Sequence, residues 1–246
     1  MSVASDFKIL RHMVFGRIRG TTHRERLESY YRDQASGYDD FRRRLLPGRS
    51  ELFAALDVPA GGRWVDMGGG TGSNLEQLGG RLSQLADLYL VDLSPSLLAV
   101  ARQRVQANRW SNVHLCEADA TTFAPDGGSV DVVTFSYSLT MIPDWFAALE
   151  RALSLLRPGG RIGVVDFYVS RKHPVDGLAR HRWLTRHFWP TWFATDNVFL
   201  SADHLPYLQR RFAGQRLTEG RSKVPYVPFG RVPYYIFIGE KQTAPG

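Results

Sequence analysis

Residues Asp66 to Gly72 read Asp-Met-Gly-Gly-Gly-Thr-Gly and follow a short apolar stretch directly. Glycine adopts positive φ angles at little cost and lets a ligand approach the backbone closely, so glycines at positions 68, 70 and 72 indicate a strand-to-helix turn that holds a ligand. A second acid, Asp92, ends the next apolar run, Leu88–Val91. A carboxylate there can accept both hydroxyls of a ribose. The two segments together predict a site for a nucleotide-type cofactor.

The spacing of the glycines separates two kinds of cofactor. The dinucleotide fingerprint G-x-G-x-x-G needs a third glycine where Ser73 or Leu75 stands, whereas D-x-G-x-G-x-G fits from Asp66 to Gly72. An acid inside the turn would repel a diphosphate but could orient an ammonium group, directly or through water. Taken alone, such a turn could also merely join a strand to a helix. The assignment therefore depends on the further matches below.

Size and composition fit one globular domain, because 246 residues can bury a full core and 43% of them are apolar. Residues 1–20 carry four Lys and Arg side chains among their apolar positions, unlike a secretory signal, and no apolar run reaches the roughly 18 to 20 residues of a membrane-spanning helix. Cys116 is the only cysteine, and no spacing among the histidines suggests a metal ligand set. We expect a cytoplasmic protein without a metal site.

The net charge of +7 is unevenly distributed along the chain. Residues 1–60 carry 11 basic and 8 acidic side chains, residues 61–170 carry 8 and 11, and residues 171–246 carry 12 and 5. The part that contains the glycine turn is therefore mildly acidic and both flanks are basic. A basic flank can be an ordinary solvated face, or it can attract a phosphate backbone or an anionic lipid surface.

Strand-like and helix-like segments alternate, which predicts an α/β fold with a parallel sheet and helical crossovers. After the strand before the glycine turn, strands are expected at 88–92, 113–117, 130–136 and 161–168, and near 215–219 and 234–241, with helices at 75–85, 96–107 and 145–156. Ser94 is expected to cap the second of these helices, with Pro95 as its first residue. Arg157-Pro158-Gly159-Gly160 is expected to end the third. We predict a seven-stranded, mostly parallel sheet with helices on both faces.

The pattern from Asp66 to Gly72 resembles motif I of the class I S-adenosylmethionine-dependent methyltransferases. The segment Glu117-Ala118-Asp119-Ala120 is similar to the part of that family in which an Asp takes the adenine amine and the next backbone N–H meets the ring. The turn from Leu156 to Gly160 also resembles a motif of the family, and the matches together cover about residues 62–168. The resemblance implies the Rossmann-like methyltransferase fold, S-adenosylmethionine as cofactor and methyl transfer as reaction.

The same resemblance assigns the cofactor contacts. The expected cofactor-binding residues lie in the glycine turn, at the ends of the second to fourth strands and in an N-terminal segment, and they are Tyr38, Asp66, Gly68, Gly70, Gly72, Asp92, Leu93, Asp119, Ala120 and Ser136. Tyr31 and Tyr38 belong to a segment that in similar enzymes covers the cofactor. We therefore expect residues 1–60 to form a helical segment and cofactor lid, and residues 61–246 a methyltransferase domain with an aromatic and basic insertion at about 171–205.

The reaction asks little of the protein beyond aligning the acceptor with the activated methyl group and excluding water. An amine with a pKa of about 8 keeps a neutral fraction near pH 7, so no strong base is required, although a Tyr or His could relay the proton. Tyr137 follows the fourth strand, where ligands of open α/β sheets bind, and Tyr31 lies in the lid segment. These two are the predicted catalytic residues. Their rings, with that of Trp145, could stabilise a quaternary cation, or Tyr137 and Trp145 could simply be core.

The flanks narrow the resemblance further. Residues 30–49, 196–198, 203–208 and 224–239 look like the methyltransferase component of betaine-lipid synthases, so the likeness spans about residues 28–240. That family methylates the amine of diacylglyceryl-homoserine to make diacylglyceryl-trimethylhomoserine. The resemblance implies N-methylation of a lipid-linked amino acid head group at an anionic membrane surface.

Two segments bear on membrane contact. Residues 171–200 place Trp183, Phe188, Trp189, Trp192 and Phe193 among Arg180, Arg182 and Arg186. This mixture suits the boundary between lipid tails and anionic head groups, or a partly buried helical cap. Residues 7–19 form an amphipathic helical pattern that could lie on anionic lipid, pack on the domain or join a second subunit. We expect a cytoplasmic protein peripheral to the inner face of the membrane, and a homo-oligomer stays open.

Three other functions stay open. A nucleic-acid methyltransferase would use the basic flanks, but Phe135–Ser138 lacks the Pro-Pro-aromatic motif of enzymes that methylate base amines and no RNA-binding module is visible, so we expect no nucleic-acid partner. Methylation of a small soluble amine, quinone or phenol would use the same core with a differently shaped insertion. The third open function is that of a module that binds the cofactor without catalysis. It stays open because the superfamily has no universal catalytic residue whose presence could be checked in the sequence.

Overall fold

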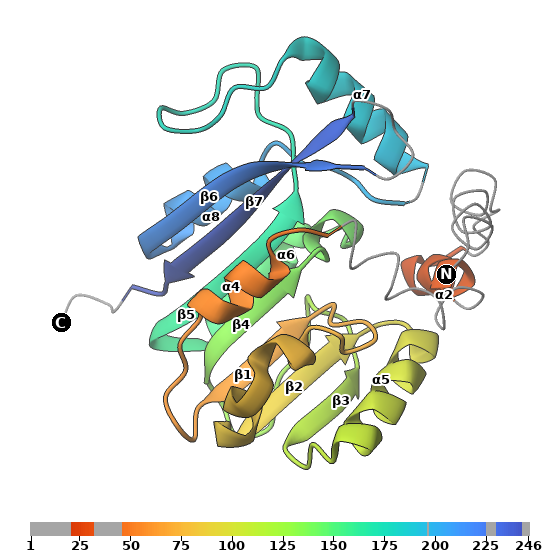
Figure 1. Cartoon of the computed structure of the whole chain (residues 1–246), viewed down its shortest axis with the longest axis vertical. Coiled ribbons are helices and arrows are strands. Elements are labelled where there is room, and N and C mark those ends of the chain that lie inside the picture. The colour runs from red at the N-terminus through yellow and green to blue at the C-terminus, as the bar shows by residue number, and fades with distance from the viewer. Residues whose placement is uncertain (1–20, 32–45, 196, 225–229, 243–246) are drawn as a thin grey trace.

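The structure is a computed structural model that describes residues 21–31, 46–195, 197–224 and 230–242 (Figure 1). In this part of the chain seven strands form one sheet in the order β3-β2-β1-β4-β5-β7-β6. The strands are β1 (Arg63–Met67), β2 (Asp87–Asp92), β3 (Val113–Glu117), β4 (Val130–Ser136), β5 (Leu156–Phe167), β6 (Ala213–Lys223) and β7 (Arg231–Glu240). Strands β1 to β5 pair in parallel, and β7 runs antiparallel to both β5 and β6. The predicted seven-stranded, mostly parallel sheet is confirmed.

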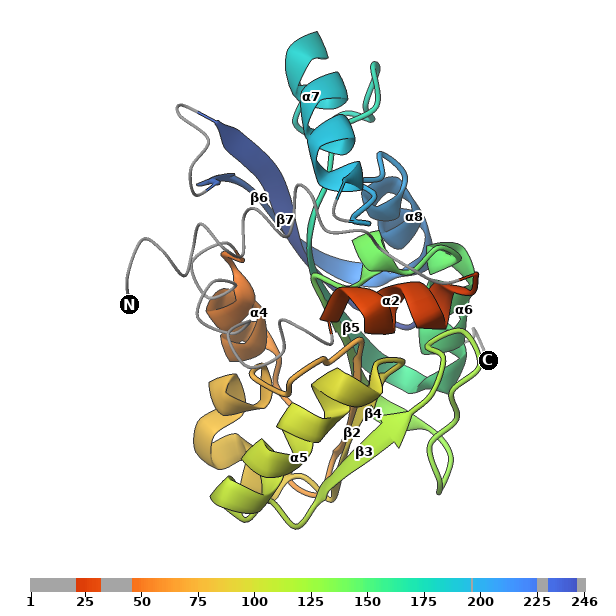
Figure 2. The ribbon, with the colours of Figure 1, turned by 90° about the vertical axis from the view of Figure 1, so that its right-hand side faces the viewer.

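Helices cover both faces of the sheet, as Figures 1 and 2 show. The helical segments are α2 (His23–Tyr31), α4 (Arg49–Ala55), η1 (Leu75–Gln84), α5 (Pro95–Asn108), η2 (Leu139–Met141), α6 (Trp145–Leu155), α7 (Trp183–Ala194) and α8 (His204–Arg211). In Figure 1, α4 and α5 lie in front of the sheet, and α6 and α8 lie behind it.

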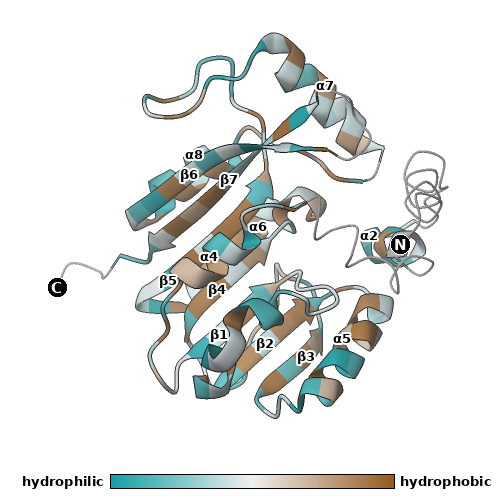
Figure 3. Ribbon diagram, in the orientation of Figure 1, coloured by the Kyte–Doolittle hydropathy of each residue, from teal (hydrophilic) through white to brown (hydrophobic). Residues whose placement is uncertain are grey.

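Two hydrophobic cores result, one on each face of the sheet. Successive side chains of a strand point to opposite faces, so Trp64 of β1 lies in the core under α4, η1 and α5, whereas Val65 and Met67 lie in the core under α6 and α8. A sheet covered on both sides needs apolar side chains at successive positions, and Figure 3 shows the central strands as largely hydrophobic. The runs that predicted the strands are therefore the residues that build both cores.

Local signals set several element boundaries. The Ser94 hydroxyl accepts a hydrogen bond from the Leu97 N–H at 3.3 Å and Pro95 starts α5, as predicted. The segment after the glycine turn is a 3₁₀ helix broken at Gly79, where φ is 53° and ψ is −135°. Strand β5 begins at Leu156, before the predicted residue 161, because its first residues pair with β4 across a register shift.

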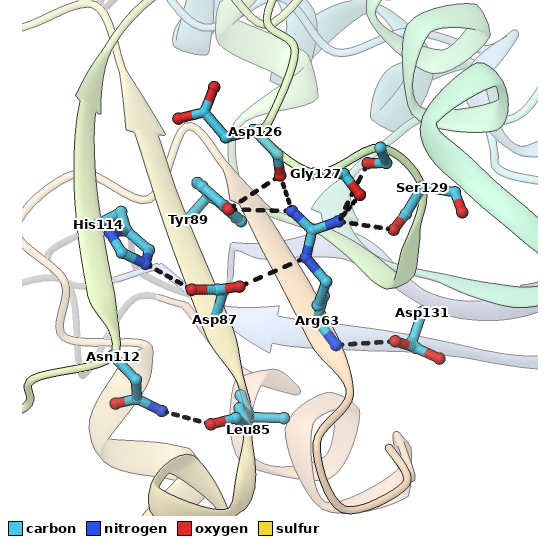
Figure 4. A network of polar contacts seen from close by, with 11 residues as sticks. Arg63, Leu85, Asp87, Tyr89, Asn112, His114, Asp126, Gly127, Ser129 and Asp131 are labelled. Carbon is cyan, nitrogen blue, oxygen red and sulfur yellow. Dashed lines mark hydrogen bonds and ion pairs between the residues drawn. The ribbon is translucent and has the colours of Figure 1, made fainter.

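A polar network closes the amino-terminal end of the sheet (Figure 4). The Arg63 guanidinium donates to the carbonyl oxygens of Gly127, Gly128 and Ser129 at 2.9, 3.3 and 3.0 Å, and to that of Asp126. It also donates to the Tyr89 hydroxyl at 3.0 Å and lies 3.5 Å from the Asp87 carboxylate. One side chain thus ties β1, β2 and the loop before β4 together.

Replacing Arg63 with Met is expected to lower the free energy of unfolding by about 2 kcal/mol, because four carbonyl oxygens and the Tyr89 hydroxyl lose a charged donor that is itself largely buried. S-adenosylmethionine affinity should stay unchanged, since the network lies at the end of the sheet opposite the glycine turn. Chemical denaturation and calorimetric titration measure the two effects. Arg102→Met, at an exposed position on α5, is the control, and equal stability of the two variants would contradict the role of the network.

Candidate cofactor site

A cavity of about 470 Å³ lies at the carboxyl ends of the central strands. Strands β1 and β4 are neighbours whose crossovers leave in opposite directions, and this is where open α/β sheets bind ligands. Its walls come from the glycine turn, the tip of β2, the segments after β3 and β4, and α2. The lining residues include Gly68, Gly70, Asp92, Leu93, Asp119, Ala120, Tyr137 and Ser138. Most of the predicted cofactor residues therefore face one cavity.

The glycine turn has the backbone that its sequence predicts. The φ angles of Gly68, Gly70 and Gly72 are 69°, 57° and 73°, a region that other residues enter at a cost. The N–H of Gly68 donates to the Val91 carbonyl at 2.8 Å, which fastens the turn to β2. A Cβ on Gly68 would lie 2.5 Å from the Ser138 Cβ, so the turn can approach the loop after β4 only without a side chain.

Asp92 is held in place by the backbone on both sides of it. One carboxylate oxygen accepts from the Gly70 N–H at 2.9 Å, and the other from the Ser94 N–H at 2.9 Å. A carboxylate at the tip of the second strand can accept hydrogen bonds from both hydroxyls of a ribose. The structure brings Asp92 to the cavity wall beside the glycine turn, and its contact with the ribose stays a prediction.

Asp66 lies behind the turn. It is fully buried, and its carboxylate accepts from the Asn74 amide at 3.0 Å and from the Thr134 hydroxyl at 2.7 Å. Burial raises the pKa of Asp66, although these bonds and the charge of Arg49 oppose the shift. The side chain is outside the set that lines the cavity. Its predicted contact with an ammonium group stays a prediction, and its visible role is to brace the turn through Asn74.

Asp119 and Ala120 line the other end of the cavity, after β3. One oxygen of Asp119 accepts from the backbone N–H of Thr121 at 2.8 Å and from its hydroxyl at 2.7 Å. Both bonds use Oδ1, and Oδ2 is the atom suited to accept from an adenine amine. The arrangement is consistent with the predicted adenine contact, which stays a prediction.

Helix α2 lies beyond the carboxyl ends of the central strands (Figure 2), and its residues His23 and Leu27 line the cavity. The Glu28 carboxylate accepts from the Ser94 hydroxyl at 2.8 Å and from the Ser96 N–H at 3.3 Å, at the start of α5. Leu27 packs with Leu97 and Met141. Sequence reasoning missed these α2 residues because their partners lie more than 60 positions away. Tyr38 and the Tyr31 side chain lie outside the described residues, so their assigned roles stay predictions.

Tyr137 lines the cavity in an unusual backbone conformation, with φ at 56°. Its hydroxyl donates to the Pro47 carbonyl at 2.6 Å, and its ring centre lies 4.7 Å from that of Phe167. Burial raises the pKa of Tyr137 well above its usual value. A phenol held in this way is a poor proton acceptor. The geometry therefore favours a role for Tyr137 in positioning the methyl acceptor over a role in relaying its proton. The predicted substrate contact of its ring stays a prediction.

The neighbouring Ser136 is buried, and its hydroxyl has no hydrogen-bond partner among the described residues. It lies outside the lining set, so its cofactor contact stays a prediction. Trp145 also lies outside that set and packs against His204 and Tyr207 on the α8 side of the sheet.

A buried acid that the sequence reading missed shapes the loop after β4. Asp166, at the end of β5, accepts from the Thr140 hydroxyl at 2.9 Å and from the Thr140 N–H at 3.2 Å. This fixes η2, whose Met141 lines the cavity. Burial raises the pKa of Asp166 to about 7. The sequence did contain a signal for this residue, because Asp166 is an acid inside the apolar run that predicted the fifth strand.

The stability of the protein should therefore depend on pH through Asp166. Its folded-state pKa is about 7 against 3.8 ordinarily, so the folded state holds the extra proton between these values. The free energy of unfolding then falls as pH rises through this window. Asp166→Asn should remove that fall, so that the variant gains on the wild type as pH rises. Denaturation across the window tests this, with exposed Asp176→Asn as control, and a pH-independent difference would contradict it.

Among the described residues, no three His, Cys, Asp or Glu side chains gather into a group able to hold a metal ion. Within the same residues, no helix is both long enough and apolar enough to cross a bilayer.

The strand order with an antiparallel β7, and a glycine turn facing an acid on the next strand, define the class I S-adenosylmethionine-dependent methyltransferase fold. Residues 65–160 match the family model described as a methyltransferase domain. That region is therefore a class I methyltransferase domain, with S-adenosylmethionine as its cofactor.

Similar proteins include quinone-pathway enzymes. The chain is 28% identical over 114 residues to a demethylmenaquinone methyltransferase of Bacillus mycoides, which covers 46% of this chain and 48% of that protein. It is 27% identical over 169 residues to the ubiquinone/menaquinone biosynthesis C-methyltransferase UbiE of Pseudomonas fluorescens, covering 66% of each. The chain thus spans about half the length of the first relatives.

A solved structure shows the same fold. Phosphoethanolamine N-methyltransferase 2 of Haemonchus contortus, in complex with S-adenosyl-L-methionine, superposes with a TM-score of 0.68 at 17% identity, over 91% of this chain and 61% of that one. At this identity the likeness concerns the fold alone.

Proposed function

We propose that the chain is an S-adenosylmethionine-dependent methyltransferase whose acceptor is a quinone or phenol ring on an apolar tail. The observation that carries the proposal is the similarity to UbiE, which extends over 66% of this chain and so reaches beyond the residues of the family model. The acceptor end of the cavity supports it, because Tyr137 and Met141 give that end an aromatic and apolar wall.

The chemistry of such a transfer fits the residues at the acceptor end of the cavity. In a phenol, or in the reduced hydroquinone form of a quinone, a ring carbon made electron-rich by a neighbouring hydroxyl attacks the methyl carbon. The sulfur–carbon bond breaks with its electron pair on sulfur, and the methylated ring then releases its proton to the solvent. The protein has to align the ring with the methyl group and to exclude water. Tyr137 keeps its proton by donating to Pro47, so it can hold a ring in place by its own aromatic face.

A second candidate is N-methylation of a lipid-linked amine, with diacylglyceryl-homoserine as the acceptor. It is supported by the resemblance of residues 30–49, 196–198, 203–208 and 224–239 to the betaine-lipid methyltransferases and by the exposed aromatic side chains of α7. Both candidates place an acceptor head group on long apolar chains. They differ in the atom that receives the methyl group.

Incubation with methyl-labelled S-adenosylmethionine and a total lipid extract separates the candidates. Label in a quinone or phenol supports the first, and label in an amino-lipid head group supports the second. Label only in a water-soluble acceptor or in RNA would contradict both. Cofactor binding without any labelled product would indicate a binding module without catalysis. Asp92→Ala protein is the control for background labelling.

A further inference from the structure

Helix α7 exposes large apolar side chains in its first two turns. The exposed fractions are 66% for Trp183, 67% for Leu184 and 39% for Phe188. The opposite side of the same helix is buried through Trp189 and Phe193. Because the buried side already anchors α7 to the domain, the outer side is free of that task. Figure 1 shows α7 at one extremity of the molecule.

Basic side chains surround this outer face. Residues 171–195 contain five Lys and Arg residues against one acid, Asp176. Arg180 and Arg182 are exposed immediately before the helix, and Lys172 is exposed in the preceding loop. Arg171 pairs with Asp203 at 2.6 Å, so this one charge is compensated. The surface therefore combines interfacial aromatic residues with a net positive charge.

The outer face of α7 is connected to the cofactor site by packed aromatic rings. The Tyr137 ring centre lies 4.7 Å from that of Phe167, which lies 5.1 Å from that of Phe193. Phe193 and Trp189 are 5.9 Å apart, and Trp189 and Phe188 are 5.0 Å apart. The cavity wall and the exposed ring of Phe188 thus belong to one contiguous series of packed aromatic rings.

We propose that the outer face of α7 docks on an anionic phospholipid bilayer, with Trp183, Leu184 and Phe188 inserted among the lipids. Aromatic and aliphatic side chains flanked by arginines suit the interface, where the rings enter the head-group layer and each basic residue near the surface contributes about 1 kcal/mol. The charge favours this occupant over a neutral apolar partner. Docking itself does not depend on the proposed function. Only the purpose that we assign to docking rests on that function: it brings a membrane-borne acceptor to the end of the cavity formed by Tyr137.

Vesicle co-sedimentation of the full-length protein tests docking without cofactor or acceptor. The wild type should bind vesicles of equimolar phosphatidylglycerol and phosphatidylcholine, and bind pure phosphatidylcholine at least about tenfold less well. Trp183→Glu/Leu184→Glu should lose about tenfold or more of its affinity for anionic vesicles, because charge replaces inserted apolar area. Phe146→Glu, at a 51% exposed aromatic residue on α6, is the matched control and should bind like the wild type.

Circular dichroism and unchanged S-adenosylmethionine affinity must accompany a supporting result. Three outcomes would overturn the proposal: no vesicle binding by the wild type, equal binding to the two vesicle types, or wild-type binding by the double variant. A dimer that the double variant dissociates, without vesicle binding, would assign the face to a second copy and also overturn it.

An activity assay separates docking from the proposed function. The double variant should lose activity on a vesicle-embedded acceptor and keep it on a short-chain, water-soluble analogue. Equal loss on both acceptors would contradict docking as the role of this face. If the wild type methylates neither acceptor, the proposed function fails, while vesicle binding still decides the docking proposal.

Discussion

Asp92→Ala is expected to abolish measurable S-adenosylmethionine binding while the protein stays folded. The carboxylate would accept two ribose hydroxyls, and hydrogen bonds to a charged group contribute about 1.5–3 kcal/mol each, so roughly a hundredfold or greater loss of affinity follows. The variant also frees the Gly70 N–H, which now donates to Asp92 at 2.9 Å. Calorimetric titration measures the affinity, and circular dichroism measures the fold.

The matched control lies at the other end of the same strand. Asp87 begins β2 and contacts Arg63 at 3.5 Å and His114 at 2.7 Å, far from the cavity. Asp87→Ala should therefore cost some stability and leave the affinity unchanged. Wild-type affinity in Asp92→Ala, or equal losses in the two variants, would contradict the role assigned to Asp92.

Gly68→Ala is expected to lower both stability and cofactor affinity. A side chain at φ 69° is strained, at about 1–2 kcal/mol, and the new Cβ would lie 2.5 Å from the Ser138 Cβ. Ser138 has little room to move, because its hydroxyl donates to the Met67 carbonyl at 2.7 Å. We expect a total loss of about 3 kcal/mol or more in the free energy of unfolding, and about tenfold weaker binding as the turn is displaced. Denaturation and titration measure the two.

Two other glycines separate strain from overlap. Gly61 has φ at 74°, close to the 69° of Gly68, and nothing within 4 Å of an added Cβ, so Gly61→Ala reports strain alone. Gly80 has neither problem, and Gly80→Ala should be close to neutral. If Gly68→Ala lowers the free energy of unfolding no more than Gly61→Ala does, the close approach of the turn to Ser138 contributes nothing to that loss.

The fold was predictable because local patterns specify its elements. The bounds of β3 and β4 agree with the sequence prediction, and β4 is a largely apolar run whose side chains are nearly all buried. Ser94 and Pro95 set the start of α5 through contacts within four residues. The bulged start of β5 escaped prediction because the register shift depends on pairing with β4, which no local pattern records.

The candidate site was predictable only where a motif carries it. The glycine turn, Asp92 and Asp119 face one cavity, as the pattern implied. The burial of Asp66 and the bond from Tyr137 to Pro47 were not predictable, because each depends on a partner brought close by tertiary packing: Thr134 for Asp66, and a carbonyl 90 positions away for Tyr137. The residues that shape the acceptor end share this property.

The central claim is that S-adenosylmethionine occupies the cavity at the carboxyl ends of β1, β2 and β4. A crystal structure with S-adenosylhomocysteine tests it most directly. We expect the ribose hydroxyls to lie within hydrogen-bond distance of Asp92, the adenine beside Asp119 and Ala120, and the sulfur on the side of Tyr137. A ligand bound elsewhere, or one whose ribose does not contact Asp92, would contradict the account.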